Sequence, residues 1–209
     1  VLCMEKSDMD IAKIKNWKEH PKVLELKAKL ENKKVRDSLR WIFELAVNLV
    51  FAALVAVLMF QTVTMQESSM EPTLAVGSQY FVNKLAYKTS SPKRGDIIVF
   101  RTNGSDDAAL HVRRVIGLPG EKVTITEGKI YINNSDVPLE EDYLKEDWVR
   151  ATGPFSFEVP EDSYLVLGDN RNDSYDARYW ENTYVTKDEI IGKAYFTYYP
   201  FSRFGSLYQ

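Results

Sequence analysis

The chain has 209 residues, of which 44% are apolar and 12% aromatic, so it is long and apolar enough for a domain with a real core, and disorder throughout is excluded. The net charge of −3 argues against a nucleic-acid-binding protein, because there is no concentrated basic surface to neutralise phosphates. Cys3 is the only cysteine and His20 and His111 are the only histidines, so we expect no internal disulfide, no zinc site and no cofactor.

Residues 1–40 form a basic leader. They carry 11 Lys and Arg against 7 Asp and Glu, a net +4, which leaves −7 for the rest of the chain. After His20-Pro21, apolar residues at Val23, Leu24, Leu26 and Leu30 alternate with charged ones. This pattern predicts one weakly amphipathic helix, solvated in the cytoplasm.

An apolar segment at residues 41–63 follows the leader, and only Glu44 and Asn48 interrupt it before Gln61. Twenty helical residues rise about 30 Å, the thickness of a bilayer's hydrocarbon core. We therefore predict a transmembrane anchor; a buried globular helix is the alternative, but such helices are rarely apolar all round. A cleaved signal peptide has a similar pattern, but the leader and the apolar run are both too long for one, which favours an uncleaved anchor.

The distribution of basic residues predicts the orientation of this anchor. Lys33, Lys34, Arg36 and Arg40 precede it, whereas no Lys or Arg follows until Lys84. By the positive-inside rule, the N-terminus lies in the cytoplasm and residues 64–209 lie outside it. The sequence thus predicts a single-pass protein of the cell membrane, with the lipid bilayer as one of its partners.

Beyond the anchor, short apolar or alternating runs are bounded by Gly, Pro, Asn and Asp, which predicts strands. Glu127-Gly128 between two of them predicts a hairpin turn. Several short strands with almost no helical pattern predict a mainly β chain, with an all-β domain at residues 64–209 behind one N-terminal transmembrane helix. The acidic residues 139–147 are expected to form a loop or a short helix. The predicted strands are residues 79–83, 96–101, 111–116, 122–126, 129–133, 155–159, 163–167 and 192–199.

Four motifs in the outer part carry the residues on which a function can be based. They are Glu67-Ser68-Ser69-Met70-Glu71-Pro72-Thr73-Leu74, Gly95-Asp96-Ile97, Arg113-Arg114-Val115-Ile116-Gly117-Leu118-Pro119-Gly120 and Gly168-Asp169-Asn170-Arg171-Asn172-Asp173-Ser174-Tyr175-Asp176-Ala177-Arg178. In this order they resemble the type I signal peptidases, the bacterial leader peptidases that use a Ser-Lys dyad. Only 47 residues separate Gly120 from Gly168, so the resemblance is to the compact Gram-positive type.

The resemblance implies roles for individual residues. Ser69, the serine directly before Met in the family's Ser-Met-x-Pro-Thr pattern, is implied as the nucleophile, with its amide in the oxyanion hole. Some members use a donor side chain two positions earlier, but Glu67 cannot donate a hydrogen bond when it is ionised. Ser174 is implied to hydrogen-bond the general base. An ion-pair network that shapes the site is implied for Arg114, Asp176 and Arg178, with Asp169 holding the loop.

Arg113 departs from the family pattern, because bacterial members carry the lysine general base at its position. The unperturbed pKa of a lysine side chain is about 10.4, and burial can lower it until the amine is neutral. The unperturbed pKa of an arginine side chain is about 12.5 to 13.8, so it stays protonated at pH 7. Three explanations stay open: an engineered replacement, a natural paralogue with little activity, or an enzyme with another base. His111 is the candidate for that base, because residues two apart on a strand share a face and imidazole is neutral near pH 7.

Substrate recognition in the resembled enzymes uses an extended peptide that pairs with strand edges, and shallow pockets take its small side chains. The matching residues are Met65, Met70, Leu74, Leu110 and Val112. Exposed aromatic residues such as Trp148, Trp180 and Phe201 are weaker candidates for docking on lipid headgroups.

The sequence therefore predicts a membrane-bound serine endopeptidase that cleaves signal peptides, with small residues before the cut, from preproteins that the export translocon delivers. The first alternative is a catalytically weak or silent paralogue that binds signal peptides or the export machinery, which Arg113 favours. A self-cleaving Ser-Lys repressor is a weaker alternative, because such a protein needs a DNA-binding domain where this chain has an apolar segment.

Overall fold

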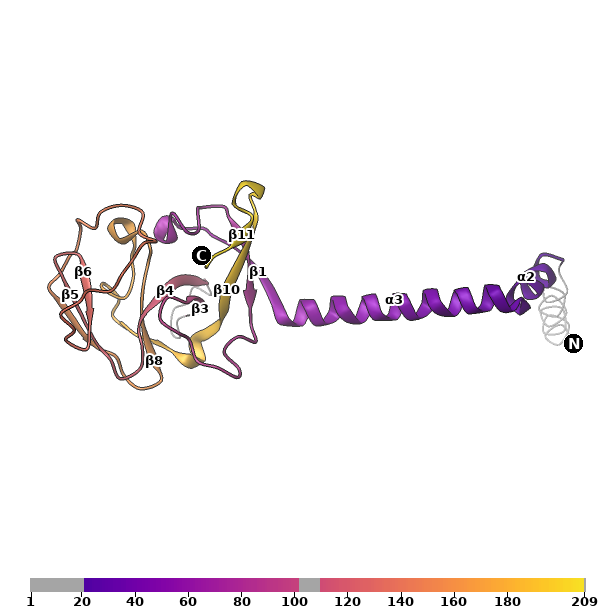
Figure 1. Ribbon diagram of the computed structural model, residues 1–209, viewed down its shortest axis with the longest axis horizontal. Coiled ribbons are helices and arrows are strands. Elements are labelled where there is room, and N and C mark those ends of the chain that lie inside the picture. Colours follow the sequence, from indigo (N-terminus) through magenta and orange to yellow (C-terminus); the bar gives the residue numbers. More distant parts are fainter. Residues whose placement is uncertain (1–20, 102–109, 209) are drawn as a thin grey trace, which may run out of the picture. The chain divides into compact units, whose positions relative to one another are not determined.

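The computed structural model describes residues 21–101 and 110–208, so the first half of the leader lies outside the described residues. The chain divides into two compact units, Val1–Ala56 and Val57–Gln209. The first unit is helical and the second is built from strands (Figure 1). Each unit is considered by itself below.

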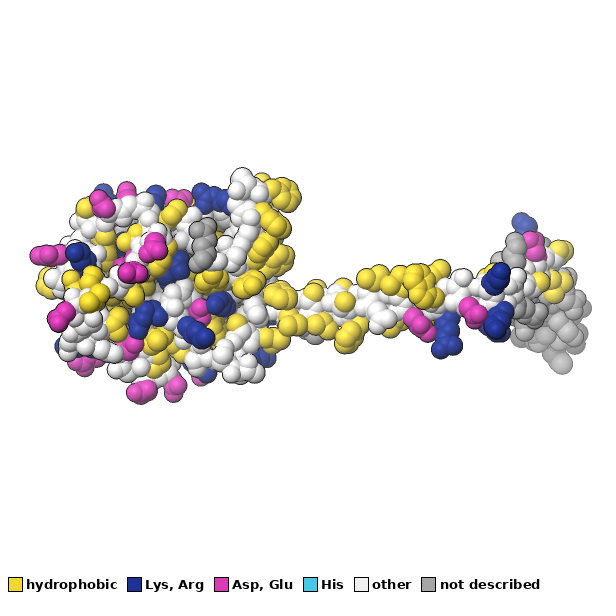
Figure 2. Space-filling model, viewed as in Figure 1, with side chains coloured by type: hydrophobic (Ala, Val, Ile, Leu, Met, Phe, Trp, Pro, Cys, Tyr) yellow, Lys and Arg dark blue, Asp and Glu magenta, His cyan; other side chains and the backbone are white. Residues whose placement is uncertain are grey.

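The helical unit contains α2 (Pro21–Glu31) and most of α3 (Lys33–Met59). Within the described residues, α3 is the one helix that is long and apolar enough to cross a membrane. Figure 2 shows apolar side chains along α3 and basic side chains toward its N-terminal end. Both polar residues inside the predicted anchor have partners in the helix itself, since Arg40 pairs with Glu44 at 3.0 Å and Asn48 donates to the Glu44 carbonyl at 2.8 Å. The described part of the leader therefore forms two helical segments, not one, and the second continues into the apolar run.

Strand β1 (Phe60–Thr64) begins where α3 ends, so the last residues of the predicted anchor are extended, not helical. It pairs antiparallel with β2 (Gln79–Asn83), and Phe60 lies opposite Asn83. Its residues alternate between exposed and partly buried, and three of them are the β-branched residues Thr62, Val63 and Thr64, which favour extended backbone. Hydropathy alone could not separate this strand from the helix before it.

The second unit contains two sheets. The larger sheet has the order β1-β2-β10-β3-β4-β8-β9, with β11 paired to β10, and β1 lies at its edge. The smaller sheet has the order β6-β5-β7. The remaining strands are β3 (Ile97–Phe100), β4 (His111–Gly117), β5 (Lys122–Thr126), β6 (Lys129–Ile132), β7 (Phe155–Glu158), β8 (Ser163–Leu167), β9 (Val185–Thr186), β10 (Ile190–Tyr199) and β11 (Gly205–Ser206).

The prediction of a mainly β chain is confirmed. Each of the eight predicted strands is present, and its ends differ from the predicted ones by at most two residues. The predicted hairpin turn joins β5 to β6, with positive φ angles of 51° at Glu127 and 72° at Gly128. Residues 139–147 form a loop. Three strands were not predicted, β1, β9 and β11, and the last two contain only two residues each.

Strand β3 lies at the centre of the core and is buried on both faces. Ile97 and Val99 pack in one apolar cluster, whereas Ile98 and Phe100 pack in another. A strand that is buried on both faces has no polar alternation, which is why its sequence is a continuous apolar run. Together β3 and its neighbour β4 form a rigid base on which the chemistry-bearing side chains are placed.

The aromatic residues proposed for lipid contact have different environments. Trp148 is 8% exposed and belongs to the core of the smaller sheet, so its predicted contact with lipid headgroups is wrong. Trp180 is partly buried against two core clusters, and Phe201 is 82% exposed. Only Phe201 is therefore free to contact another surface.

Candidate active site

Ser69 lies in a short 3₁₀ helix, η1 (Ser68–Met70), that follows β1 along the chain. Only 3% of the residue is exposed. Asn170 fixes this turn, because its backbone N–H donates to the Ser69 carbonyl at 3.0 Å and its side-chain Nδ2 donates to the Ser68 carbonyl at 3.1 Å. The Ser68 hydroxyl instead donates to Asp173 Oδ2 at 2.8 Å. The two adjacent serines thus have different environments, and only Ser69 faces Arg113.

Arg113 projects from β4 directly at the Ser69 hydroxyl. Its Nη1 donates to Ser69 Oγ at 2.8 Å and to the Val112 carbonyl at 2.7 Å. Its Nη2 donates to Glu67 Oε2 at 3.0 Å and to the Tyr175 carbonyl at 2.8 Å. The side chain is 3% exposed, and its Nε has no partner within the described residues. A buried cation therefore contacts the hydroxyl at the position where the resembled family has its lysine.

Glu67 completes a triangle with these two residues. The Ser69 hydroxyl donates to Glu67 Oε2 at 3.2 Å, and the Glu67 side chain is 50% exposed. Burial raises the pKa of Glu67, but the positive charge and hydrogen bond of Arg113, with smaller contributions from His111 and the Ser69 hydroxyl, outweigh it and hold that pKa below its usual value of 4.5. Glu67 is therefore an ionised acceptor at pH 7. From the sequence, Glu67 was expected only to be unable to donate a hydrogen bond; its place two residues before Ser69 was the signal available for its role as an acceptor.

His111, the predicted alternative base, shares a face of β4 with Arg113. Both side chains lie beside Trp180, at 6.4 Å between ring centroids for His111 and 5.9 Å from the centroid for the Arg113 guanidinium. Burial and the charge of Arg113 lower the pKa of His111, so its imidazole is neutral at pH 7. Its Nδ1 has no partner, and across residues 21–101 and 110–208 no hydrogen bond joins it to Ser69.

Ser174, the residue predicted to support the general base, does not bond to Arg113. Its hydroxyl is buried and has no partner in the part of the chain that the structure describes. The Tyr175 carbonyl accepts from Arg113 instead. Ser174 packs tightly on Gly168, where an added Cβ would lie 2.2 Å from Ser174 Oγ and 2.5 Å from the Ser69 carbonyl oxygen. Gly168 is thus needed for the close approach of the loop to Ser69, a role that its place in the motif did not reveal.

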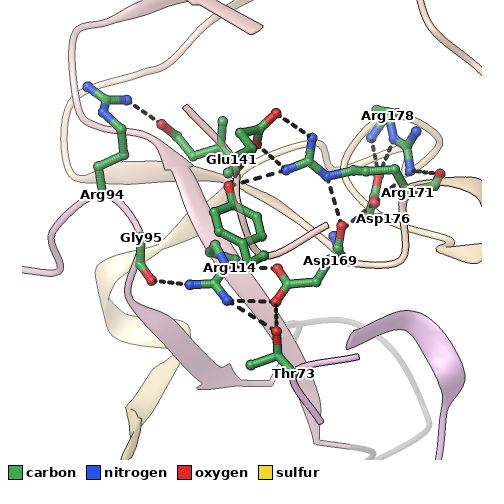
Figure 3. Close-up of polar contacts among 12 residues, drawn as sticks. Thr73, Arg94, Gly95, Arg114, Glu141, Asp169, Arg171, Asp176 and Arg178 are labelled. Atoms are coloured by element: carbon green, nitrogen blue, oxygen red, sulfur yellow. Dashed lines mark hydrogen bonds and ion pairs between the residues drawn. The ribbon is translucent and has the colours of Figure 1, made fainter. Parts of the chain in front are cut away.

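Arg114 and Arg178 form separate buried ion pairs beside the site, not one network (Figure 3). Arg114 Nε donates to Asp169 Oδ1 at 2.8 Å and its Nη2 to Oδ2 at 2.6 Å. Arg178 pairs with Asp176 at 2.8 Å. Within the described ranges no ion pair links Arg114 to Asp176, so the predicted three-residue network is wrong. The physical reason is that each carboxylate already has a two-pronged contact with its own arginine.

A further ion pair, which the sequence did not predict, holds the loop that carries Asp169. Arg171 pairs with Glu141 at 2.5 Å (Figure 3). Its guanidinium also lies over the Trp148 ring, 4.8 Å from the centroid. Glu141 comes from the acidic loop at residues 139–147. Its partner could not be found from sequence, because the two residues lie 30 positions apart.

A groove of about 400 Å³ runs along β1 and β4 to Glu67 and Arg113, whose side chains contact Ser69 Oγ. Among the predicted substrate residues, Met65, Leu110 and Val112 line it. Met70 and Leu74 do not: both are fully buried in the core beneath η1, so their predicted role in substrate binding is wrong. The other lining residues are Thr62, Val63, Thr64, Gln66, Glu67 and Arg113.

The sequence matches the family described as "Signal peptidase, peptidase S26" over residues 38–199. The chain belongs to this signal peptidase family. Signal peptidase IB of Staphylococcus aureus (strain Mu50) is 36% identical over 183 residues, which cover 81% of this chain and 93% of the relative. Signal peptidase I of Leptolyngbya laminosa is 45% identical over 146 residues, 66% of this chain and 68% of the relative.

Two further signal peptidases complete the comparison. Probable signal peptidase I-2 of Synechocystis sp. is 39% identical over 144 residues, 67% of this chain and 63% of the relative, so the chain spans less than two thirds of that relative's length. A crystal structure of a signal peptidase I from Enterococcus faecalis is 35% identical, with a TM-score of 0.41 over 50% of this chain and 97% of that one. The resemblance noted from the motifs to the signal peptidase family is confirmed.

The signal peptidase motifs of this chain, far apart in the sequence, meet at one place. Thr73 Oγ1, from the serine motif, donates to Asp169 Oδ2 at 2.5 Å, and the Gly95 carbonyl accepts from Arg114 Nη1 at 2.9 Å (Figure 3). Within the described residues no group of His, Cys, Asp and Glu side chains is arranged to hold a metal ion. The chemistry that the site offers on its own residues is that of a buried hydroxyl between a carboxylate and a guanidinium.

Proposed function

We propose that this chain is a membrane-anchored serine endopeptidase that cleaves signal peptides from exported preproteins, with Ser69 as the nucleophile. The observation that carries the proposal is the groove that ends at Glu67 and Arg113, the two side chains bonded to Ser69 Oγ. Family membership supports the reaction class. No metal or organic cofactor takes part in this proposal.

The groove suits an extended peptide. Strand β1 lies at the edge of the larger sheet, so its outer N–H and C=O groups are available for pairing with an added strand. Met65, Leu110 and Val112 provide an apolar lining near Ser69. A signal peptide bound here in β conformation would present its scissile carbonyl to Ser69, with small side chains before the cut facing this lining.

The direct test compares the two adjacent serines in the full chain in detergent, with a preprotein that carries Ala-x-Ala before its cleavage site. Ser69→Ala should abolish cleavage, whereas Ser68→Ala should retain most of it, because the Ser68 hydroxyl contacts exposed Asp173 and not Arg113. Equal losses in the two variants would remove the assignment of Ser69 as the nucleophile.

The membrane topology is part of the same proposal: residues 1–40 in the cytoplasm, residues 41–63 as the anchor and residues 64–209 outside. It is supported by the apolar length of α3 and by the Lys and Arg residues before residue 41. Protease added to intact spheroplasts should digest the β unit and spare the leader. The opposite pattern would show the reverse orientation. The β unit would then have no access to exported preproteins or to the outer side of the export translocon.

A second candidate is a catalytically weak or silent paralogue that binds signal peptides or the export machinery. Arg113 favours it, because this residue cannot act as the lysine does. In that case the full chain should bind a synthetic signal peptide without cleaving it, and Arg113→Lys should raise turnover.

A further inference from the structure

Ser69 Oγ is held between two groups of opposite charge. Arg113 Nη1 donates to it at 2.8 Å, and Glu67 Oε2 lies 3.2 Å away. From this geometry, and resting on the proposed signal-peptide cleavage, we propose that Glu67 is the general base that takes the proton of Ser69, and that Arg113 stabilises the oxygen left behind. The chain then replaces the lysine of a Ser-Lys dyad by two residues that divide its tasks.

The direction of the serine proton follows from the donors around it. A guanidinium has only donors, so the contact with Arg113 Nη1 uses a lone pair of Ser69 Oγ and leaves the hydroxyl hydrogen free. The carboxylate of Glu67 has only acceptors when ionised, and it is the acceptor found within reach of Oγ in the described residues. The hydroxyl hydrogen therefore points at the one neighbouring group that can receive it.

The charge balance makes the transfer feasible. Before it, Arg113 Nη2 contacts the Glu67 carboxylate at 3.0 Å; after it, Glu67 is neutral and Nη1 of the same guanidinium contacts the Ser69 alkoxide. A positive charge thus faces one negative charge throughout, and no charge is left uncompensated in a buried site. Preorganised donors of this kind stabilise developing anions most where water is excluded, and Ser69 is 3% exposed.

The catalytic cycle uses no group beyond these residues and water. Ser69 Oγ attacks the scissile carbonyl carbon as its proton moves to Glu67 Oε2; the C–N bond then breaks and Glu67 returns the proton to the leaving amine. Water next attacks the acyl ester, gives one proton to Glu67, and releases the acid when the proton returns to Ser69 Oγ. Because the Glu67 side chain is 50% exposed and lines the groove, it can reach both the leaving amine and the incoming water.

Two observations indicate that position 113 does not serve as a lysine site. The Ser174 hydroxyl, implied by the family resemblance to bond to the base, has no partner among the described residues, and the Arg113 side chain bonds to Tyr175 and Glu67 instead. The rival explanation is that the Glu67–Arg113 pair merely holds Ser69 in place. A pH profile separates the two, because a structural pair does not set the ionisation that limits turnover.

The charged and titratable groups facing Glu67 are Arg113 and His111, and the pair holds its pKa below 4.5 after the opposing effect of burial. Turnover of the wild-type chain should therefore stay constant from neutral pH down to below pH 4.5 and fall only when Glu67 gains a proton. A limb between pH 4.5 and pH 6.5 that disappears in His111→Ala would make His111, whose pKa is lowered from 6.5, the base and overturn the proposal.

The experiment measures kcat and KM for the Ala-x-Ala preprotein in detergent from pH 3 to pH 10, for the wild type, His111→Ala and four variants at positions 67, 71 and 113. Glu67→Gln should lower kcat by about 10²- to 10⁴-fold, the range typical of general-base catalysis, with little change in KM. Glu71→Gln, which removes a nearby carboxylate paired with Lys145, is the matched control and should leave kcat within about 2-fold. Thermal unfolding of each variant checks that the fold is kept.

The decisive variant combines Glu67→Gln with Arg113→Lys. A lysine at position 113, freed from the carboxylate, can be deprotonated, so the double variant should regain turnover at alkaline pH with a limb shifted several pH units upward from that of the wild type. Arg113→Lys alone should not raise turnover, because Glu67 keeps the new ammonium charged. An increase of 10²-fold or more in that single variant, or full activity of Glu67→Gln, would overturn the assignment of Glu67.

These outcomes are distinguishable from a failure of the proposed function. If the wild type is silent and Arg113→Lys cleaves the preprotein, Glu67 is not the base but the peptidase assignment stands. If neither chain cleaves and Ser69→Ala binds the signal peptide as tightly as the wild type, the proposed peptidase function fails, and the inference fails with it.

Discussion

Arg113 and Arg114 are consecutive residues of β4 whose side chains lie in very different surroundings. Arg114 forms a two-pronged pair with Asp169, whose side chain is 0% exposed, and also bonds to the Gly95 carbonyl. Arg113 pairs with Glu67, whose side chain is 50% exposed, and its own Nε has no partner within the described residues. Both arginine side chains are buried, but only Arg113 lines the groove.

This difference teaches how to separate a structural ion pair from a functional one. A pair that is buried and fully bonded stabilises a loop, because removing either partner leaves a charge without compensation. A pair with a half-exposed carboxylate, an orphaned Nε and the proposed nucleophile between its members contributes less to stability and remains free to exchange protons. The predictions below test this contrast.

The largest effect on stability is expected for Asp169→Ala. It leaves the Arg114 guanidinium buried without its carboxylate and also removes the acceptor of Thr73. We expect the free energy of unfolding to fall by about 3–5 kcal/mol, as measured by urea denaturation. Glu67→Ala, the matched truncation beside Arg113, should cost far less; equal losses would show that the two pairs do not differ in kind.

The second effect concerns Gly168, which lies between the two regions. In Gly168→Ala the new Cβ would lie 2.5 Å from the Ser69 carbonyl oxygen and 2.2 Å from Ser174 Oγ, so the loop and the serine turn must separate. We expect about 1–3 kcal/mol of destabilisation and, because a nucleophile displaced by about 1 Å loses its alignment, about 10²-fold lower cleavage of the preprotein. Gly77→Ala is a comparison variant, since an added Cβ there meets nothing within 4 Å. Its positive φ of 81° costs stability but does not move Ser69.

Much of the fold could be predicted from sequence because its strands are short, alternating or apolar runs between clear turns. What could not be predicted is where a long apolar run changes backbone conformation, as at Phe60, where α3 gives way to β1. The apolar run weakens only gradually there, with Gln61, Thr62 and Thr64 among apolar residues, and the pairing of β1 with β2 defines the strand. Short strands such as β9 could not be predicted for the same reason, since only their pairing with a neighbouring strand defines them.

The sequence predicted which residues form the site better than it predicted their contacts. Motif resemblance pointed to Ser69, Arg113, Arg114 and Asp169, and the structure places them together. The motif resemblance placed Arg114 in a network with Asp176 instead of Asp169 and gave Glu67 no role as an acceptor. The partner of each arginine depends on the face of β4 from which its side chain projects. Consecutive strand residues point to opposite faces, so a single position separates the two environments.

The smallest expected effect is the contribution of Glu67 to stability, and it tests most directly whether the Arg113–Glu67 pair differs from the Arg114–Asp169 pair. Its pKa is lowered in the folded chain, so its contribution is present above its ordinary pKa of 4.5 and is lost as pH falls through the lower folded value. Since the side chain is half exposed, we expect Glu67→Gln to reduce the free energy of unfolding by no more than about 1 kcal/mol at pH 7. The difference between wild type and variant should shrink as the pH falls from 7 to below 4.5. Glu67 raises the pKa of His111 against the lowering by burial and Arg113, so the variant should also carry a lower His111 pKa. Urea denaturation at the two pH values measures the difference in stability. A loss of several kcal/mol at pH 7 would instead place Glu67 with Asp169 as a structural partner, and the large fall in kcat expected for the same variant would then reflect a damaged fold.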